Sequence, residues 1–149
     1  MEEVLDIYKK PYDPQCPQVC MDEMSPQLIG EVRAPLAIEP GKPRRYDTEY
    51  KRNGTANIFM AFEPLAGQRY TPVTEQRTKV DWAHVIQILV DRHDPHAEKI
   101  CLVLDNLNTH NKSSLYEAFT PDEAKRIADK FDIHYTYSSH SLAIIDLTI

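Results

Sequence analysis

At 149 residues with a formal net charge of −6, the chain is long enough for one domain with a buried core. Its 42% hydrophobic and 27% charged residues are typical of a soluble globular protein and exclude an intrinsically disordered one. No apolar run approaches the roughly 18 residues of a membrane-spanning helix, and the acidic N-terminus lacks the features of a secretory signal. We therefore expect a cytoplasmic protein whose cysteines, Cys16, Cys20 and Cys101, are reduced.

The first third of the sequence contains few patterns of regular structure. Residues 1–16 are expected to be a linker remnant, because their prolines stop any longer helix. A short first strand is expected at residues 18–22, ending in Asp22. Residues 25–55 are expected to be irregular, because repeated prolines and glycines leave no room for a long regular element.

Residues 25–55 are also locally basic in an acidic chain. The segment has six basic and four acidic side chains, so it carries +2 while the remainder carries −8. Net acidity argues against a nucleic-acid partner, but a basic segment is compatible with phosphate contacts, and a solvated loop explains the same pattern. The candidate phosphate-contacting residues of this segment are Arg44, Arg45, Lys51 and Arg52.

The middle of the chain predicts a hairpin followed by a helix. Residues 56–63 and 68–74 are expected to pair as antiparallel strands, and Pro72 confines the second strand to a sheet edge. Residues 79–92 are expected to be helical, because apolar residues recur on one face and Thr78 can cap the first turn.

The most informative pattern is at residues 100–105. Five apolar residues followed by Asp105 predict a strand that is buried on both faces and carries a carboxylate at its end. The polar residues that follow, including His110, can hold a metal, a water molecule or a phosphate, although a turn that caps the strand also explains them. Asp22 is a second carboxylate at a strand end, and the two together suggest a metal site.

The last elements complete a fold class. A second helix is expected to begin at Pro121 with a capping box at Thr120, and a strand is expected at residues 132–136. This order predicts an α/β fold with a mixed five-stranded sheet, an antiparallel hairpin and flanking helices. Asp22 and Asp105 would then lie on neighbouring strands, about 4.8 Å apart, which suits carboxylates that bridge two Mg²⁺ ions. Glu23, next to Asp22, would point to the opposite face and is left out of the site.

Four segments of the chain form a recognisable set: Val19–Glu23, Val80–His84, Leu102–His110 and Ile133–Thr136. Together they resemble the DDE transposases of bacterial insertion sequences, in the IS six-thirty group related to the mariner transposases. The Asp-Asn-x-x-x-His block after an apolar strand is the most specific of them. The resemblance covers nearly the whole chain and implies a ribonuclease-H-like fold with metal-dependent cutting and joining of DNA. Asp22 and Asp105 match the first two carboxylates of the family triad, and Mg²⁺, or Mn²⁺ in its place, is the implied cofactor.

The sequence departs from the family pattern in two places. The family normally carries a helix-turn-helix DNA-binding region ahead of this domain, and the residues after Thr136 lack the family's Pro, Lys, Trp and Asn. With a one-residue gap, Asp146 falls at the position of the third carboxylate, and a chance match in a scrambled tail is the alternative. We therefore expect residues 17–149 to be a C-terminally incomplete catalytic domain whose activity is impaired.

The resemblance also implies partners. Transposon-end DNA is the expected partner, a homodimer stays open, and neither a membrane nor a small-molecule substrate is expected. The competing interpretation is a non-catalytic remnant that binds DNA or dimerises, and a receiver-like phospho-acceptor domain is a weaker one that the hairpin opposes. His110 can touch substrate phosphate, orient a metal ligand or be an ordinary hydrogen-bonded loop histidine. The candidate DNA contacts are Arg44, Arg45, Lys51, Arg52 and His110.

Overall fold

The central strands of the structure are β1 (Gln18–Met24) and β7 (Ile100–Asp105), which run parallel as neighbours. The computed structural model describes residues 6–33, 39–43, 49–105 and 110–136. The other strands of the main sheet are β4 (Asn57–Glu63), β5 (Gln68–Tyr70), β6 (Val73–Thr74) and β8 (Phe131–Thr136). Their order is β5-β4-β1-β7-β8, with β6 also paired to β4. The β4 pairings are antiparallel and the β7–β8 pairing is parallel, which confirms the predicted mixed sheet, although it has six strands and not five because the second hairpin strand is divided into β5 and β6.

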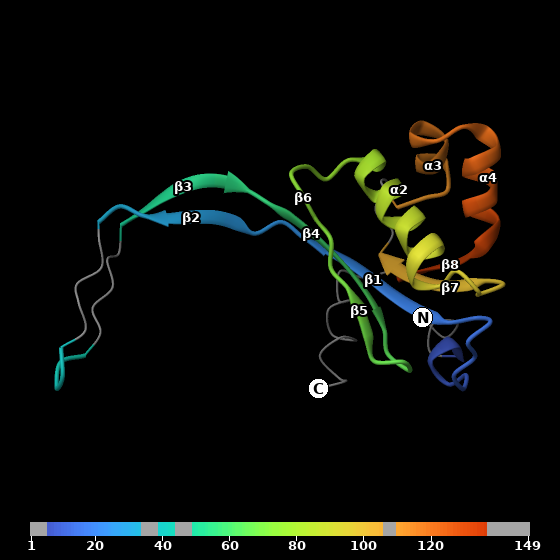
Figure 1. Ribbon diagram of the computed structural model, residues 1–149, viewed down its shortest axis with the longest axis horizontal. Helices are drawn as coiled ribbons and strands as arrows, with labels where there is room; N and C mark the ends of the chain where they lie inside the picture. Colours follow the sequence, from blue (N-terminus) through green and yellow to red (C-terminus); the bar gives the residue numbers. More distant parts are fainter. Residues whose placement is uncertain (1–5, 34–38, 44–48, 106–109, 137–149) are drawn as a thin grey trace.

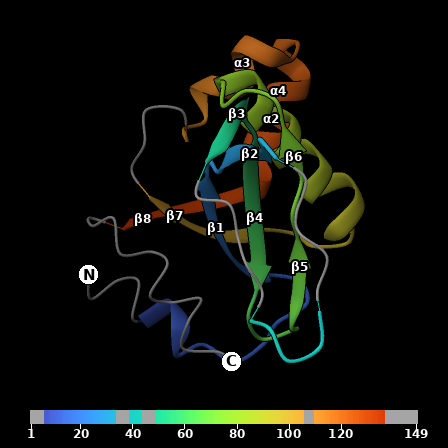
Figure 2. The ribbon, with the colours of Figure 1, turned by 90° about the vertical axis from the view of Figure 1, so that its left-hand side faces the viewer.

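Helices cover one face of this sheet (Figure 1, Figure 2). None of the helices in the described ranges is long and apolar enough to span a membrane. Side chains of the helices and the sheet form the main core, which includes Trp82, Ile86, Leu102, Leu104 and Ile127. The helices are α2 (Lys79–Ile88), the π-helical turn η1 (Leu89–His93) that continues it, α3 (Ser113–Ala118) and α4 (Pro121–Lys130).

The opposite face of β1 and β7 packs against the N-terminal part of the chain. A helical turn at residues 6–8 places Ile7 in a second apolar cluster with Cys20, Cys101 and Val103. Side chains of β7 therefore alternate between the two clusters, and all five residues before its final aspartate are buried. The predicted burial of this strand on both faces is confirmed.

The prediction that residues 25–55 are irregular is wrong for part of this segment. Two strands, β2 (Gln27–Glu31) and β3 (Tyr50–Thr55), pair antiparallel as a separate ribbon. This ribbon extends away from the body of the protein, as Figure 1 shows, and we call it the arm. The prolines of the segment precede β2 or lie between the two strands, so they remove no hydrogen bond from the ladder.

The predicted hairpin and helices are mostly confirmed. The second hairpin strand lies at the sheet edge but is split, because Pro72 cannot donate a ladder hydrogen bond and only its carbonyl oxygen accepts one, from the backbone N–H of Phe59 at 3.0 Å. Thr78 caps α2 as predicted. The capping box predicted at Thr120 is wrong, because its side chain makes no capping hydrogen bond. The carboxylate of Glu123 instead accepts hydrogen bonds from the side chains of Gln87 and Arg126.

Candidate active site

Asp22 and Asp105 lie at the carboxyl ends of two adjacent parallel strands. The pairing of β1 with β7 ends at Cys20 and Val103, and each aspartate stands two residues beyond its strand's last paired residue. Because strand side chains alternate with a period of two, both aspartates belong to the face of the sheet that carries Cys20 and Val103. The predicted adjacency of the two strands is confirmed.

The sheet opens between these two strand ends. β1 remains paired with β4 as far as Met24, and β7 remains paired with β8 through Asp105, although β1 and β7 no longer pair with each other. In open α/β sheets, ligands bind outside the carboxyl ends of the parallel strands. Asp22 and Asp105 stand on the two sides of this opening.

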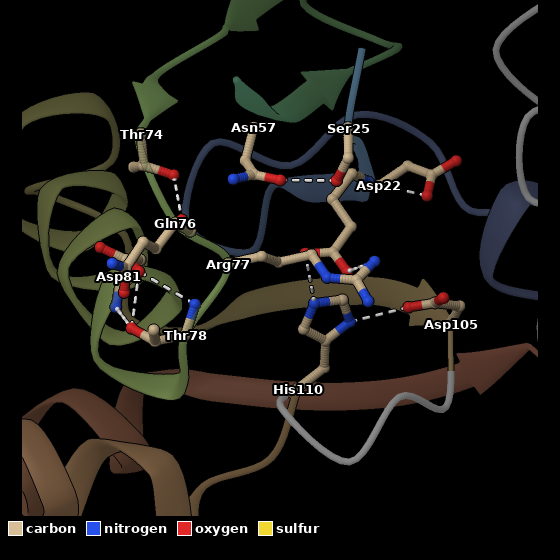
Figure 3. A network of polar contacts seen from close by, with 11 residues as sticks. Asp22, Ser25, Asn57, Thr74, Gln76, Arg77, Thr78, Asp81, Asp105 and His110 are labelled. Carbon is tan, nitrogen blue, oxygen red and sulfur yellow. Dashed lines mark hydrogen bonds and ion pairs between the residues drawn. The ribbon is translucent and has the colours of Figure 1, made fainter. Parts of the chain in front are cut away.

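Each aspartate is held by a neighbouring group. Asp22 is half-buried, and its Oδ1 accepts a hydrogen bond of 2.8 Å from the backbone N–H of Glu23. Asp105 is 21% exposed, and its Oδ1 accepts a hydrogen bond of 2.7 Å from Nδ1 of His110 (Figure 3). Both aspartates are thus only partly buried, while their backbones are fixed in the sheet.

His110 is buried between two carboxylates. Its side chain is 1% exposed, and its Nε2 lies 3.3 Å from Oε2 of Glu23, whose side chain is 3% exposed. Burial disfavours the charged imidazolium, but the carboxylates of Glu23 and Asp105 outweigh it and raise the pKa of His110. The ring also stacks on Trp82 with the ring centroids 5.8 Å apart, and the Tyr135 hydroxyl donates to the His110 carbonyl oxygen at 2.9 Å.

Arg77 completes this network from the loop before α2. Its Nη1 lies 3.0 Å from Oε1 of Glu23, and Figure 3 shows the Arg77 side chain reaching toward His110 from the α2 side. The residue after Arg77, Thr78, is fixed by the cap of α2. Its Oγ1 accepts a hydrogen bond from the Asp81 N–H, and the Asp81 carboxylate accepts one from the Thr78 N–H. The start of α2 therefore places the Arg77 guanidinium next to the buried Glu23 carboxylate.

The sequence interpretation missed Glu23. It does lie on the face opposite Asp22, as expected, but that face holds the buried His110 ring. The alternation of strand side chains predicts the face on which the Glu23 side chain lies. Its partner on that face, His110, is identified only by the tertiary contact. Direct contact of His110 with DNA would require the ring to leave this buried position, whereas its hydrogen bond to Asp105 suits a residue that orients a ligand.

The remaining predicted site residues have different places. Asp146, Arg44 and Arg45 lie outside the described residues. Lys51 and Arg52 lie on strand β3 of the arm, so their expected position in a loop is wrong. Both side chains are exposed.

The donor set of the site suits a hard divalent cation. Asp22 and Asp105 offer carboxylate oxygens, which Mg²⁺ and Mn²⁺ prefer. Within the described residues, no three His, Cys, Asp or Glu side chains are close enough together to hold a metal ion. The two aspartates therefore fit a metal that keeps several waters and takes further ligands from substrate or from another part of the chain.

The sequence pattern of the DDE superfamily endonucleases matches residues 17–147. The chain belongs to this family. The matched range includes Asp22 and Asp105 as well as both edge strands of the main sheet, β5 and β8. No curated protein matches the chain significantly.

Solved structures show the same fold. The Mos1 mariner paired-end complex with Mn is 15% identical with a TM-score of 0.52, covering 98% of this chain and 46% of that one. The Mos1 strand transfer complex is 14% identical with a TM-score of 0.55, covering 98% of this chain and 44% of that one. The simian T-cell lymphotropic virus intasome in complex with the PP2A regulatory subunit B56 gamma is 10% identical with a TM-score of 0.53. The match covers 93% of this chain and 40% of that one. The predicted ribonuclease-H-like fold is confirmed, and this chain spans less than half the length of each of these proteins.

Proposed function

We propose that this chain is the catalytic domain of a transposase, which cuts DNA strands and joins them in transposition with the help of divalent metal ions. The observation that carries the proposal is the placement of Asp22 and Asp105 at the open carboxyl ends of adjacent parallel strands. Membership of the DDE superfamily endonucleases supports a phosphodiester as the substrate. The fold likeness to the Mos1 strand transfer complex supports DNA transposition as the context.

Asp22 and Asp105 would hold Mg²⁺, or Mn²⁺ in its place. The Mos1 paired-end complex of the same fold contains Mn, which supports this choice. Such ions, when bound, lower the pKa of an attacking water or hydroxyl and neutralise charge on the leaving oxygen. Asp146 is the proposed third carboxylate, and its position in the family pattern is the reason.

The chain's own residues have three tasks in this mechanism. The strands β1 and β7 fix the backbones of both aspartates, because the strands are buried in the core on either side. His110 holds one oxygen of Asp105 through a hydrogen bond, which leaves the other oxygen for a cation. The cations Arg44, Arg45, Lys51 and Arg52 would bind the phosphate backbone of transposon-end DNA and so position it.

The proposal is tested by cleavage of supercoiled plasmid or end-sequence DNA in Mn²⁺. We expect slow nicking by the unaltered chain, because the sequence around Asp146 departs from the family pattern. Asp22→Ala and Asp105→Ala should abolish nicking, and Asp129→Ala, a change of an exposed aspartate on α4, should leave it unchanged. Asp146→Glu, which restores the family's carboxylate, should raise the rate, and Asp146→Ala should remove it.

Nicking that survives Asp22→Ala or Asp105→Ala would overturn the proposed function. DNA binding without cleavage in every variant, Asp146→Glu included, would favour the non-catalytic alternative, in which the domain binds DNA or dimerises. Both outcomes are read from the same gel and a parallel binding assay.

A further inference from the structure

A buried carboxylate lies behind the proposed metal site and has no role in the chemistry described above. The Glu23 side chain is 3% exposed, and neither of its carboxylate oxygens has a hydrogen-bond partner among the described residues. A buried ionised carboxylate is costly unless other charges compensate it. Here Nη1 of Arg77 lies 3.0 Å from one carboxylate oxygen, and Nε2 of His110 lies 3.3 Å from the other.

Arg77 and His110 differ in what they can do without Glu23. Arg77 is 49% exposed and could turn toward water if its partner were lost. His110 is 1% exposed and has no such freedom, since it is enclosed by the core and stacked on Trp82. Replacing Glu23 would therefore affect the position of the His110 ring more than that of Arg77.

The His110 ring connects Glu23 to Asp105. One ring nitrogen, Nε2, faces Glu23, and the other, Nδ1, donates to Oδ1 of Asp105 at 2.7 Å. A five-membered ring fixed at one nitrogen has its other nitrogen fixed in direction as well. The ring thus links the Asp105 carboxylate to a carboxylate of the neighbouring strand β1, whose side chain lies on the face of the sheet opposite Asp22.

We infer that Glu23 is a positioning residue for the metal site: through His110 it holds the Asp105 carboxylate in the orientation that binds a divalent cation. This inference rests on the proposed function. Residues that orient a metal ligand without touching the metal commonly contribute about 10–100-fold to metal affinity. Glu23 touches neither metal nor substrate, so its effect is on affinity and not on the chemical step.

The test is the affinity of the purified full chain for Mn²⁺, measured by electron paramagnetic resonance of free Mn²⁺ with no DNA present. Glu23→Met keeps the side-chain volume and removes the charge and the contact with Nε2. We expect it to weaken Mn²⁺ binding by about 10–100-fold. Glu23→Gln keeps an oxygen that can meet Nε2, and its loss of affinity should be smaller.

Two further variants serve as controls. Glu63→Gln changes another buried carboxylate of the same sheet, outside this network, and should leave Mn²⁺ affinity unchanged. Asp105→Ala should abolish binding. The fluorescence of Trp82, the single tryptophan of the chain, reports whether each variant is folded.

The outcomes separate the two proposals. Wild-type affinity in folded Glu23→Met and Glu23→Gln, with binding lost in Asp105→Ala, overturns the positioning role and leaves the proposed function intact. Absence of Mn²⁺ binding in the unaltered chain overturns the proposed metal site and the positioning role with it. If Glu23→Met does not fold, the affinity of Glu23→Gln decides: a wild-type value overturns the inference and a reduced one supports it.

Discussion

Asp22 and Asp105 stand at equivalent positions on β1 and β7, each two residues past the last pair that joins these strands. Both strands stay paired to their outer neighbours at this point, so the sheet separates only between the two aspartates. Charge repulsion between two carboxylates at such an opening is relieved when a divalent cation binds between them.

Mn²⁺ should raise the melting temperature of the chain. A ligand at 100 times its dissociation constant stabilises the folded state by about 2.7 kcal/mol, which is several degrees in a chain of this size. Asp22→Ala and Asp105→Ala should lose this gain, while Asp129→Ala should keep it. Thermal unfolding with and without Mn²⁺ measures the difference, and an equal gain in all four proteins would place the metal elsewhere.

The two threonines that precede helices should differ in their contribution to stability. Thr78→Ala should lower the free energy of unfolding by about 1 kcal/mol, because its side chain accepts the Asp81 N–H at the start of α2. Thr120→Ala should change it by less than about 0.5 kcal/mol, because the Thr120 side chain makes no such bond. Urea unfolding of both variants measures this, and equal losses would contradict the assigned caps.

Glu63→Gln should stabilise the protein at neutral pH. Burial, and then the negative charge of Asp94, raise the pKa of Glu63. A carboxyl whose pKa is raised by folding opposes folding above that raised pKa, and the penalty disappears as pH falls toward its ordinary value near 4.5. We therefore expect a higher melting temperature for Glu63→Gln than for the unaltered chain at pH 7.

The matched control for Glu63→Gln is Glu98→Gln, since Glu98 is exposed. Melting temperatures from pH 4 to pH 8 test the prediction for both variants. A difference between Glu63→Gln and the unaltered chain that grows on acidification would have the wrong sign for this account.

The arm should supply part of the DNA affinity. Replacing Lys51 and Arg52 by Ala should weaken binding and reduce the slope of log K against log salt by up to about 2, because each lost phosphate contact removes about 0.9. The control pair, Lys9→Ala with Lys125→Ala, removes the same charge from exposed positions outside the arm. Fluorescence anisotropy with duplex DNA at several salt concentrations separates them, and equal effects would mean that net charge alone matters.

Local patterns in the sequence were sufficient to predict the main sheet and helix α2. The apolar run of β7 and the periodic apolar face of α2 each follow from one stretch of chain, and both are buried as predicted. The arm could not be found in this way. All six residues of β3 are exposed, so its strand has no apolar alternation and depends on pairing with a strand about 20 residues earlier.

The site was predictable only in part, for a similar reason. Asp22 and Asp105 follow from strand ends, which are local features. The Glu23–His110 contact joins β1 to a residue beyond β7, and no local pattern predicts which charged group meets a buried ring. The capping box expected at Thr120 was wrong because Glu123 has distant partners, Gln87 among them, that a short motif does not reveal.

The central claim is that Asp22 and Asp105 together hold a divalent metal ion. Anomalous X-ray diffraction from crystals of the chain soaked in MnCl₂ tests it most directly, because it locates Mn²⁺ without reference to activity. We predict a peak between the two strand ends, within about 2.5 Å of an oxygen of each aspartate. A well-ordered site with no peak there, or a peak bound only by other residues such as Glu63 and Asp94, would contradict the account.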